Sequence, residues 1–269
     1  IDAKNAFELH DTFGFPIDLT EVMAEERGLV VDRSGYEQLM EEARETSRAT
    51  SATERKMNIP PDVLSQLEED GVLPSEDSFK YVSNSHATTV IAIWDGQTLC
   101  DSVNEKQSVG VILKETPFYA EAGGQVGDRG ALVNGENTFV VHDTHKQGDY
   151  ILHIGECHSG SISCGMDVEA TVCSELRDQT EKNHTTTHLL NHSLRHVLGE
   201  DVHQKGSLVD EEKLRFDFSH GHAVTDKQLH AIEQEVNGAI EADLAVHAKV
   251  VPLDDAMRIC GLRAVFGER

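Results

Sequence analysis

Hydrophobic residues recur at intervals of three and four positions through residues 1 to about 50. This spacing is typical of helices that bury one face. Two sets of helix breakers interrupt it, at residues 14–16 (Gly-Phe-Pro) and at Gly28. The pattern therefore predicts a helical segment, with a second helix opening at Thr20 and a third following residues 32–35.

Residues 51–78 are more polar and contain "NIPPDV" and "EEDGVLPSED". Prolines and polar turn residues at this density are typical of a segment between domains. We expect a linker here, with one short helix at about residues 61–69.

Short alternating or β-branched runs separated by turn residues fill residues 79–173. These runs are "FKYVS", "ATTVIAIW", "VGVILKE", "GALVNGENTFVVHDTHK", "DYILHIG" and "DVEATVC". They predict a mainly antiparallel, barrel-like β unit.

The pattern returns to a helical period over residues 174–198, which carry a leucine-rich stripe and end before Gly199. A strand pair, "HQKGSLV" and "KLRFDFSH", follows, and then a helix with Thr225 as its N-cap. "AVHAKVVPL" predicts a further strand and "DDAMRICGLRAVF" the start of a last helix. Because strands and helices come in separate runs, the predicted class is α+β, with residues 174–269 forming a last domain.

Composition limits the possible partners. The 269 residues include 48 acidic and 23 basic side chains, giving a net charge of −25. This is the opposite of the basic surface of a general nucleic-acid binder, so any RNA contact must be local. No apolar run is long enough for a membrane span and no leader is evident, so a cytoplasmic location is expected. Five cysteines without a CxxC pair predict reduced thiols.

The stretch "NHTTTHLLNHSLRHVLG" places histidines four residues apart, at positions 184, 188, 192 and 196. On a helix, residues four apart lie about 40° round from one another, so His184 and His188 can reach one ion, but all four histidines cannot. From the residues alone, a metal-binding pair and a polar helix face both remain open. Threonines stand where a zinc protease needs a glutamate, which argues against that class.

This stretch, followed by "VHQKGSLVDEEKLRFDFSH", resembles the editing domain of alanyl-tRNA synthetases. Three more blocks agree with that family, in its order: "LHDTFGFPIDLT", "FYAEAGGQVGDRG" and "GLRAVFGE". The resemblance implies that residues 1–50 end a tRNA-recognition region and that the last domain is an α/β-sandwich carrying the HxxxH helix. Since the chain begins at Ile1 and stops within an apolar pattern, we expect it to be a piece of a longer protein.

By the same resemblance, His184 and His188 are two ligands of a Zn²⁺ site. The other two, a Cys and a His in a CxxxH block, are expected beyond Arg269, and Cys260 lacks the histidine needed to replace them. Asn191 stands where many members have a further histidine, which is not a ligand in the pattern.

Six further residues are given roles by the resemblance, each with a plainer alternative. Gln204 matches a pocket glutamine but also suits a strand end, and Thr187 matches a residue that discriminates amino acids but is also an ordinary β-branched residue of a helix. Gly123, Gly124 and Gln125 match an editing-site loop or an ordinary hairpin loop. Asp11 matches a residue facing the tRNA acceptor stem or caps a helix. His142, Asp143 and His145 lie near a hairpin tip and are assigned no chemistry.

The resemblance implies a protein that joins alanine to tRNA(Ala), with ATP and Mg²⁺ bound upstream of Ile1, and an editing site that hydrolyses tRNA(Ala) mischarged with serine or glycine. The zinc can activate water or hold the substrate. Two other functions remain open: a free-standing trans-editing hydrolase and a non-catalytic tRNA-binding module.

Overall fold

A computed structural model describes residues 1–11, 15–41, 57–246, 251–256 and 258. The chain divides into two compact units. The first comprises residues 1–181 with 208–212, and the second comprises residues 182–207 with 213–269. The division falls within helix α5 (Ser174–Leu198), whereas the sequence placed the start of the last domain at residue 174.

Three helical stretches open the first unit: α1 (Ala3–Asp11), α2 (Ile17–Glu25) and residues 33–41. The predicted breaks are confirmed at their described residues, since Phe15 and Pro16 are not helical and Gly28 has a φ of 68°; Gly14 lies outside the described residues. The predicted opening at Thr20 is wrong. Pro16, with φ fixed near −59°, precedes the first turn, and Thr20 is buried inside the helix.

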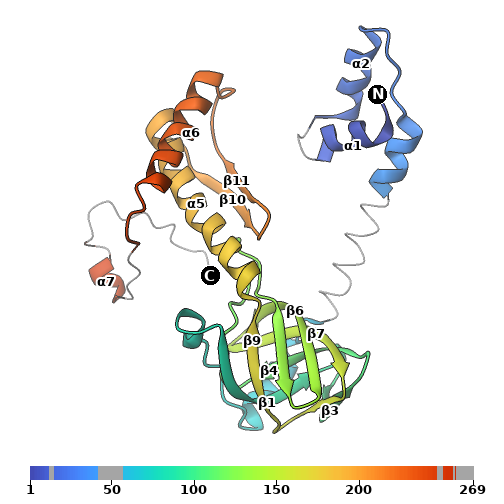
Figure 1. The fold of residues 1–269 in the computed structure, drawn as a ribbon, viewed down its shortest axis with the longest axis vertical. Coiled ribbons are helices and arrows are strands. Elements are labelled where there is room, and N and C mark those ends of the chain that lie inside the picture. The colour runs from blue at the N-terminus through green and yellow to red at the C-terminus, as the bar shows by residue number, and fades with distance from the viewer. Residues whose placement is uncertain (12–14, 42–56, 247–250, 257, 259–269) are drawn as a thin grey trace. The chain divides into compact units, whose positions relative to one another are not determined.

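A closed antiparallel barrel forms the main body of the first unit (Figure 1). Its strands, in hydrogen-bonding order, are β1 (Ser85–Trp94), β4 (Ser108–Leu113), β7 (Tyr150–Ser159), β6 (Asn137–Gln147), β5 (Gly130–Asn134) and β9 (Asp167–Val172). β9 pairs with β1, which closes the ring and leaves neither strand with a free edge there. β2 (Leu99–Cys100) pairs antiparallel with the end of β1, and β3 (Ser102–Asn104) pairs with β8 (Ser161–Ser163).

Alternating side chains along the strands separate two apolar clusters. On β4, Val111 and Leu113 belong to one cluster and Ile112 to the other; on β1, Ile93 and Trp94 divide in the same way. The first cluster also includes Val90, Val103, Val109, Phe118, Leu132, Phe139, Val141, Cys157, Ile162, Val168, Ala170 and Val172. Both faces of these two strands are therefore buried.

The second cluster is completed by residues from the predicted linker. Helix α4 (Pro61–Glu69) forms where a helix was predicted, and its Leu67 is 2% exposed among barrel side chains. The Tyr150 hydroxyl on β7 donates to the Val72 carbonyl at 2.9 Å. The segment from Met57 onward is thus part of the barrel's packing and not an unpacked connection.

The strand predicted for "FKYVS" is wrong. Residues Ser78–Tyr81 form a short 3₁₀ helix, η1. The Ser78 amide donates to the Glu76 carboxylate at 3.0 Å, and Lys80 pairs with Asp77 at 2.5 Å, three residues before it. These local bonds favour a helical turn over extended backbone.

Replacing Leu67 by alanine is expected to lower the free energy of unfolding of the barrel by about 2–3 kcal/mol, because the change leaves a cavity between α4 and the sheet. Leu73→Ala is the matched control, since Leu73 is 69% exposed, and it should change stability by less than about 0.5 kcal/mol. Urea denaturation measures both. Equal, small effects of the two substitutions would show that α4 does not stabilise the barrel.

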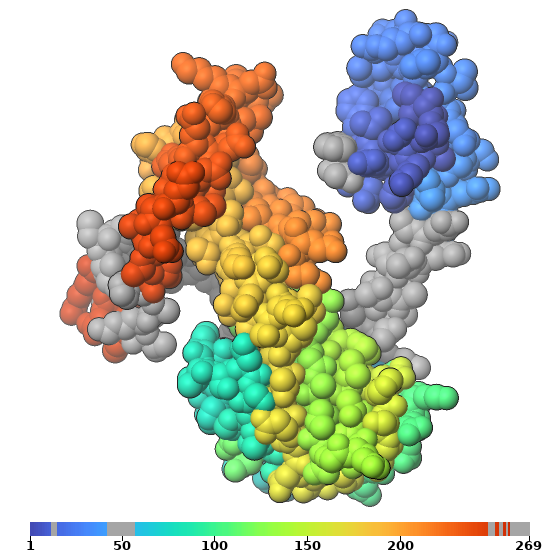
Figure 2. All heavy atoms as spheres, in the orientation of Figure 1, coloured from blue at the N-terminus to red at the C-terminus, as the bar shows by residue number. Residues whose placement is uncertain are grey.

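The second unit contains most of α5, β10 (Gln204–Val209) as far as Ser207, its partner β11 (Leu214–Phe218), helix α6 (Asp226–Glu241) and α7 (Leu253–Ala256). α6, orange to red in Figure 2, covers α5 through an apolar cluster around Leu194, Val202 and Ile232. The predicted Thr225 N-cap is confirmed, with a capping box to Gln228. The strand expected at residues 245–253 is not formed at its described ends, because residues 245–246 and 251–252 are not in a strand and Leu253 begins α7; residues 247–250 lie outside the described part of the chain.

The α+β class and the antiparallel β unit are confirmed. Among the described helices, none has the length and apolar character needed to cross a membrane. Cys100, Cys157, Cys164 and Cys173 are free thiols, as predicted, and Cys260 lies outside the described residues.

Candidate functional site

His184 and His188 lie on successive turns of α5, within the second unit. Their rings stack with centroids 5.1 Å apart and planes 13° from parallel. His184 is half-buried and His188 is exposed. Burial, and then the neighbouring His188, lower the pKa of His184, which favours the neutral imidazole that binds metal.

The other two histidines of the stripe have a different neighbour. His196 Nδ1 lies 3.0 Å and His192 Nε2 3.6 Å from the Glu235 carboxylate on α6. These two histidines therefore contact α6, and the stripe splits into two pairs with different surroundings.

Thr187 and Gln204 differ in exposure. Thr187 is 6% exposed, and its hydroxyl donates to the Asn183 carbonyl one turn earlier at 2.9 Å. The hydroxyl oxygen still has lone pairs to accept a bond. Gln204, the exposed first residue of β10, donates from Nε2 to the Ser207 hydroxyl at 3.3 Å. Their catalytic roles stay predictions.

The glycine-rich segment forms a tight turn in the first unit. The amides of Ala122 and Gln125 each donate to the other residue's carbonyl, at 3.2 and 3.0 Å. Gly123 and Gly124 have φ values of 61° and 84°, a region that side chains disfavour. Gln125 is 5% exposed, so a ligand contact at residues 123–125 falls to their backbone.

Asp11 is the exposed last residue of α1. The residues that follow it in "HDTFGFP" at positions 12–14 lie outside the described part of the chain. Its contact with tRNA stays a prediction.

Two charged clusters were missed in the sequence. Arg177, near the start of α5, is 5% exposed and pairs with Asp128, which is 7% exposed. Its guanidinium also donates to the Asn84 side chain at 2.9 Å and the Pro117 carbonyl at 2.6 Å. These partners are far apart in the sequence, so no local sequence pattern predicted their contact.

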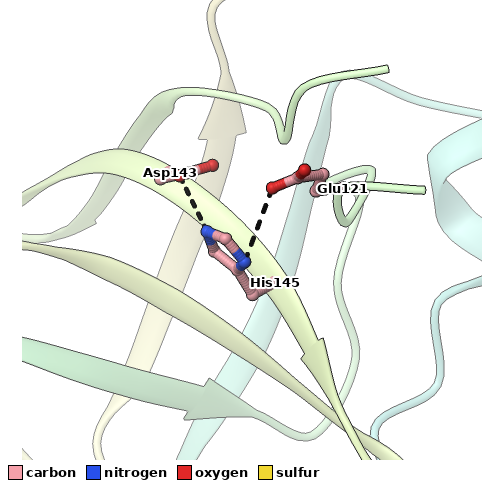
Figure 3. Close-up of side chains that lie close together, drawn as sticks. All are labelled: Glu121, Asp143 and His145. Atoms are coloured by element: carbon pink, nitrogen blue, oxygen red, sulfur yellow. Dashed lines mark hydrogen bonds and ion pairs between the residues drawn. The ribbon is translucent and has the colours of Figure 1, made fainter. Parts of the chain in front are cut away.

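The second cluster consists of Glu121, Asp143 and His145, shown in Figure 3. Although burial alone raises the pKa of Asp143, the hydrogen bond and charge of His145 hold it below its usual value. Asp143 and His145 were visible as an alternating pair near a hairpin tip, but Glu121 comes from the glycine-rich segment.

The chain is similar in sequence to known proteins. The model of the family described as tRNA synthetases class II (A) matches residues 1–176. This match covers more than half of the chain. The chain belongs to the class II tRNA synthetases (A).

Curated relatives of this class II synthetase chain extend the match through both histidines of α5. This chain is 44% identical to the alanine–tRNA ligase of Candida albicans and 42% identical to the alanine–tRNA ligase of Pseudomonas syringae pv. tomato. It is 41% identical to the mitochondrial alanine–tRNA ligase of Saccharomyces cerevisiae. Each alignment covers 100% of this chain but only 28–30% of the relative. The chain thus spans less than a third of the length of these ligases.

Proposed function

We propose that this class II synthetase chain is part of an alanine–tRNA ligase and carries most of its editing site. The observation that supports this best is the stacked pair His184 and His188, in a chain at least 40% identical along its whole length to alanine–tRNA ligases. The substrates of the editing site are Ser-tRNA(Ala) and Gly-tRNA(Ala). The reaction is hydrolysis of the ester between the amino acid and the terminal ribose.

The selectivity problem explains why such a site is useful. A pocket for alanine cannot reject glycine by size, and it excludes serine only weakly because serine adds one hydroxyl. A separate hydrolytic site that accepts these two amino acids removes the errors after they are made. The alanine, ATP and Mg²⁺ of the synthetic reaction bind outside this chain.

His184 and His188 would hold a zinc ion. The fit rests on their shared helix face and on the burial that favours neutral His184. A structural or catalytic zinc needs more than two protein ligands, and a Cys and a His beyond Arg269 complete the set in this proposal. When bound, the zinc supplies Lewis-acid activation of water or of the ester.

Two side chains of this chain would act on the substrate directly. The exposed Gln204 amide donates one Nε2 hydrogen to Ser207, so its second hydrogen can be donated to the ester carbonyl and its Oε1 can accept a bond from water. The Thr187 hydroxyl, already donating to Asn183, can accept a bond from the serine hydroxyl. Asp11 and the backbone of residues 123–125 would contact the tRNA.

Two alternative functions make different predictions from the editing function proposed above. A free-standing trans-editing hydrolase would act without a synthetase part, but the class II match begins at residue 1, in the N-terminal helices. A non-catalytic tRNA-binding module would bind tRNA(Ala) and leave the ester intact. Activity therefore discriminates between the proposal and the module.

In an alanine–tRNA ligase that contains this chain, His184→Asn with His188→Asn is expected to remove about one zinc and to slow deacylation of Ser-tRNA(Ala) at least 100-fold, with alanylation unchanged. Elemental analysis and ester hydrolysis measure the two effects. His192→Asn with His196→Asn is the matched control, because those rings face Glu235. Undiminished deacylation in the first variant would refute the zinc-centred proposal.

The 269-residue chain by itself should bind zinc weakly at this pair, since two imidazoles leave half of the ion's coordination shell open. Tight zinc that depends on His184 and His188 in the isolated chain would contradict that expectation.

A further inference from the structure

We propose that Glu121, Asp143 and His145 form a second metal site, on the barrel, for a divalent first-row ion such as Mn²⁺. One ligand atom from each residue lies within 4.8 Å of the other two. The cluster is the one group of this kind found among the described residues. It shares no residue with the His184–His188 pair, which belongs to the other unit.

The geometry around His145 brings both carboxylates to one imidazole. His145 Nε2 lies 2.8 Å from Asp143 Oδ2, and Nδ1 lies 3.6 Å from Glu121 Oε2 (Figure 3). A proton on the imidazole supplies one positive charge against two negative ones. As they lie, the two carboxylates contact different ring nitrogens, so an ion bound at one nitrogen replaces the contact there and draws the other carboxylate round. A divalent ion held in this way balances both negative charges.

The backbone of β6 aims two of the ligands. The register between β6 and β7 shifts between Val141 and Asp143, which marks a β-bulge. Bulges re-aim side chains and are common beside functional sites. After the bulge, Asp143 and His145 lie two residues apart and so share one face. The Thr144 amide donates to Asp143 Oδ1 at 2.8 Å, which leaves Oδ2 directed at His145.

The third ligand is held by the glycine-rich segment. The Glu121 amide donates to the Thr144 carbonyl at 2.8 Å, and Thr144 is fully buried. A side chain at Gly127 would clash with that same carbonyl and would lie 2.7 Å from Asp143 Oδ1. The glycine therefore permits the segment to close onto β6, and this contact positions Glu121 opposite His145.

The ligand set and its exposure fit an exchangeable ion. Two carboxylates with one imidazole suit Mn²⁺ among the first-row ions, and three protein ligands leave positions for water or an anion. The side chains of His145, Asp143 and Glu121 are 21%, 36% and 53% exposed, so the ion has access from solvent. Binding ties the glycine-rich segment to β6.

The test measures Mn²⁺ binding to the 269-residue chain by electron paramagnetic resonance, at physiological salt. The chain carries His184→Asn and His188→Asn, which remove the other proposed site. One bound Mn²⁺ is expected. Asp143→Asn and His145→Gln should each weaken its affinity at least tenfold, and Glu121→Gln should weaken it less because Glu121 is the most exposed ligand.

Matched controls address the acidity of the chain, which attracts cations without any site. Asp149→Asn makes the same charge change at an exposed position of the same hairpin, and His142→Gln removes an exposed neighbouring histidine. Both should keep wild-type affinity. Equal weakening in Asp149→Asn and Asp143→Asn, or the absence of stoichiometric Mn²⁺, would overturn the proposal.

Circular dichroism and Trp94 fluorescence report whether each variant folds. If Asp143→Asn does not fold, paramagnetic broadening of the His145 ring signals by Mn²⁺ in the wild-type chain decides the question. Broadening centred on His145 supports the site, and broadening spread over all exposed histidines refutes it.

Discussion

Replacing Arg177 by methionine is expected to lower the free energy of unfolding of the barrel by about 3–5 kcal/mol. The substitution keeps much of the side-chain volume but leaves the Asp128 carboxylate buried without its cation. The Asp128 carboxylate retains its bond from the Tyr119 amide at 2.6 Å. The acceptors on Asn84 and Pro117 also lose their donor. A buried charge without a partner is far more costly than the loss of an exposed pair.

Trp94 provides the measurement. It is the single tryptophan of the chain and is 1% exposed within the barrel, so its fluorescence in urea reports barrel unfolding. Arg129→Met is the control, because Arg129 pairs with Glu211 while 40% exposed, and it should cost less than about 1 kcal/mol. If the two variants lose the same stability, the buried pair does not have the role assigned to it.

Acid is expected to destabilise the barrel through His153, which is fully buried on β7. Burial lowers the pKa of His153 to about 4 from an ordinary 6.5. The imidazole is held neutral: Nδ1 donates to the Val111 carbonyl at 3.0 Å, and the Thr116 hydroxyl donates to Nε2 at 2.8 Å. Protonation would add a second N–H to the ring, at Nε2, where it would face the hydrogen of the Thr116 hydroxyl.

The direction of the change in stability with pH depends on whether the folded or the unfolded chain binds the proton at His153. Between pH 6.5 and about 4 the unfolded chain is protonated at His153 and the folded chain is not. Stability is therefore complete above pH 6.5 and falls as the pH drops to about 4, by about 3 kcal/mol in total from this one group.

His153→Gln should be less stable than wild type at pH 7.5 but should lose about 2–3 kcal/mol less on acidification to pH 4.5. Urea midpoints at the two pH values, followed by Trp94, measure the difference. His158→Gln, an exposed histidine on the same strand, should retain the wild-type pH dependence. An unchanged acid loss in His153→Gln would show that other groups control it.

Periodicity predicted the elements whose pattern is long or strongly capped. α5 and α6 were located by their apolar stripes and by Gly199 and Thr225, and β5 and β6 lie within a run that was predicted to be extended. "FKYVS" failed because its strand-like composition was overridden by side-chain bonds within a four-residue turn.

The long-range contacts that position the candidate sites could not be predicted from periodicity. Pairing between β1 and β9, the Arg177–Asp128 pair and the approach of Glu121 to His145 join residues distant in sequence. A single sequence holds no record of which distant residues meet. The histidine pair was found because both ligands lie on one helix, where spacing alone sets the geometry.

The pairing of the first and last strands of the barrel has a consequence for synthesis of the protein. Ser85 on β1 and its partner Thr171 on β9 are separated by 86 positions in the chain. At translation rates of about 5–20 residues per second, several seconds pass between the synthesis of β1 and that of β9, and during this time the edge of β1 that pairs with β9 is unpaired. During that interval the nascent strand can pair with another chain, so the rate at which the ribosome reaches β9 sets how long this hazard lasts.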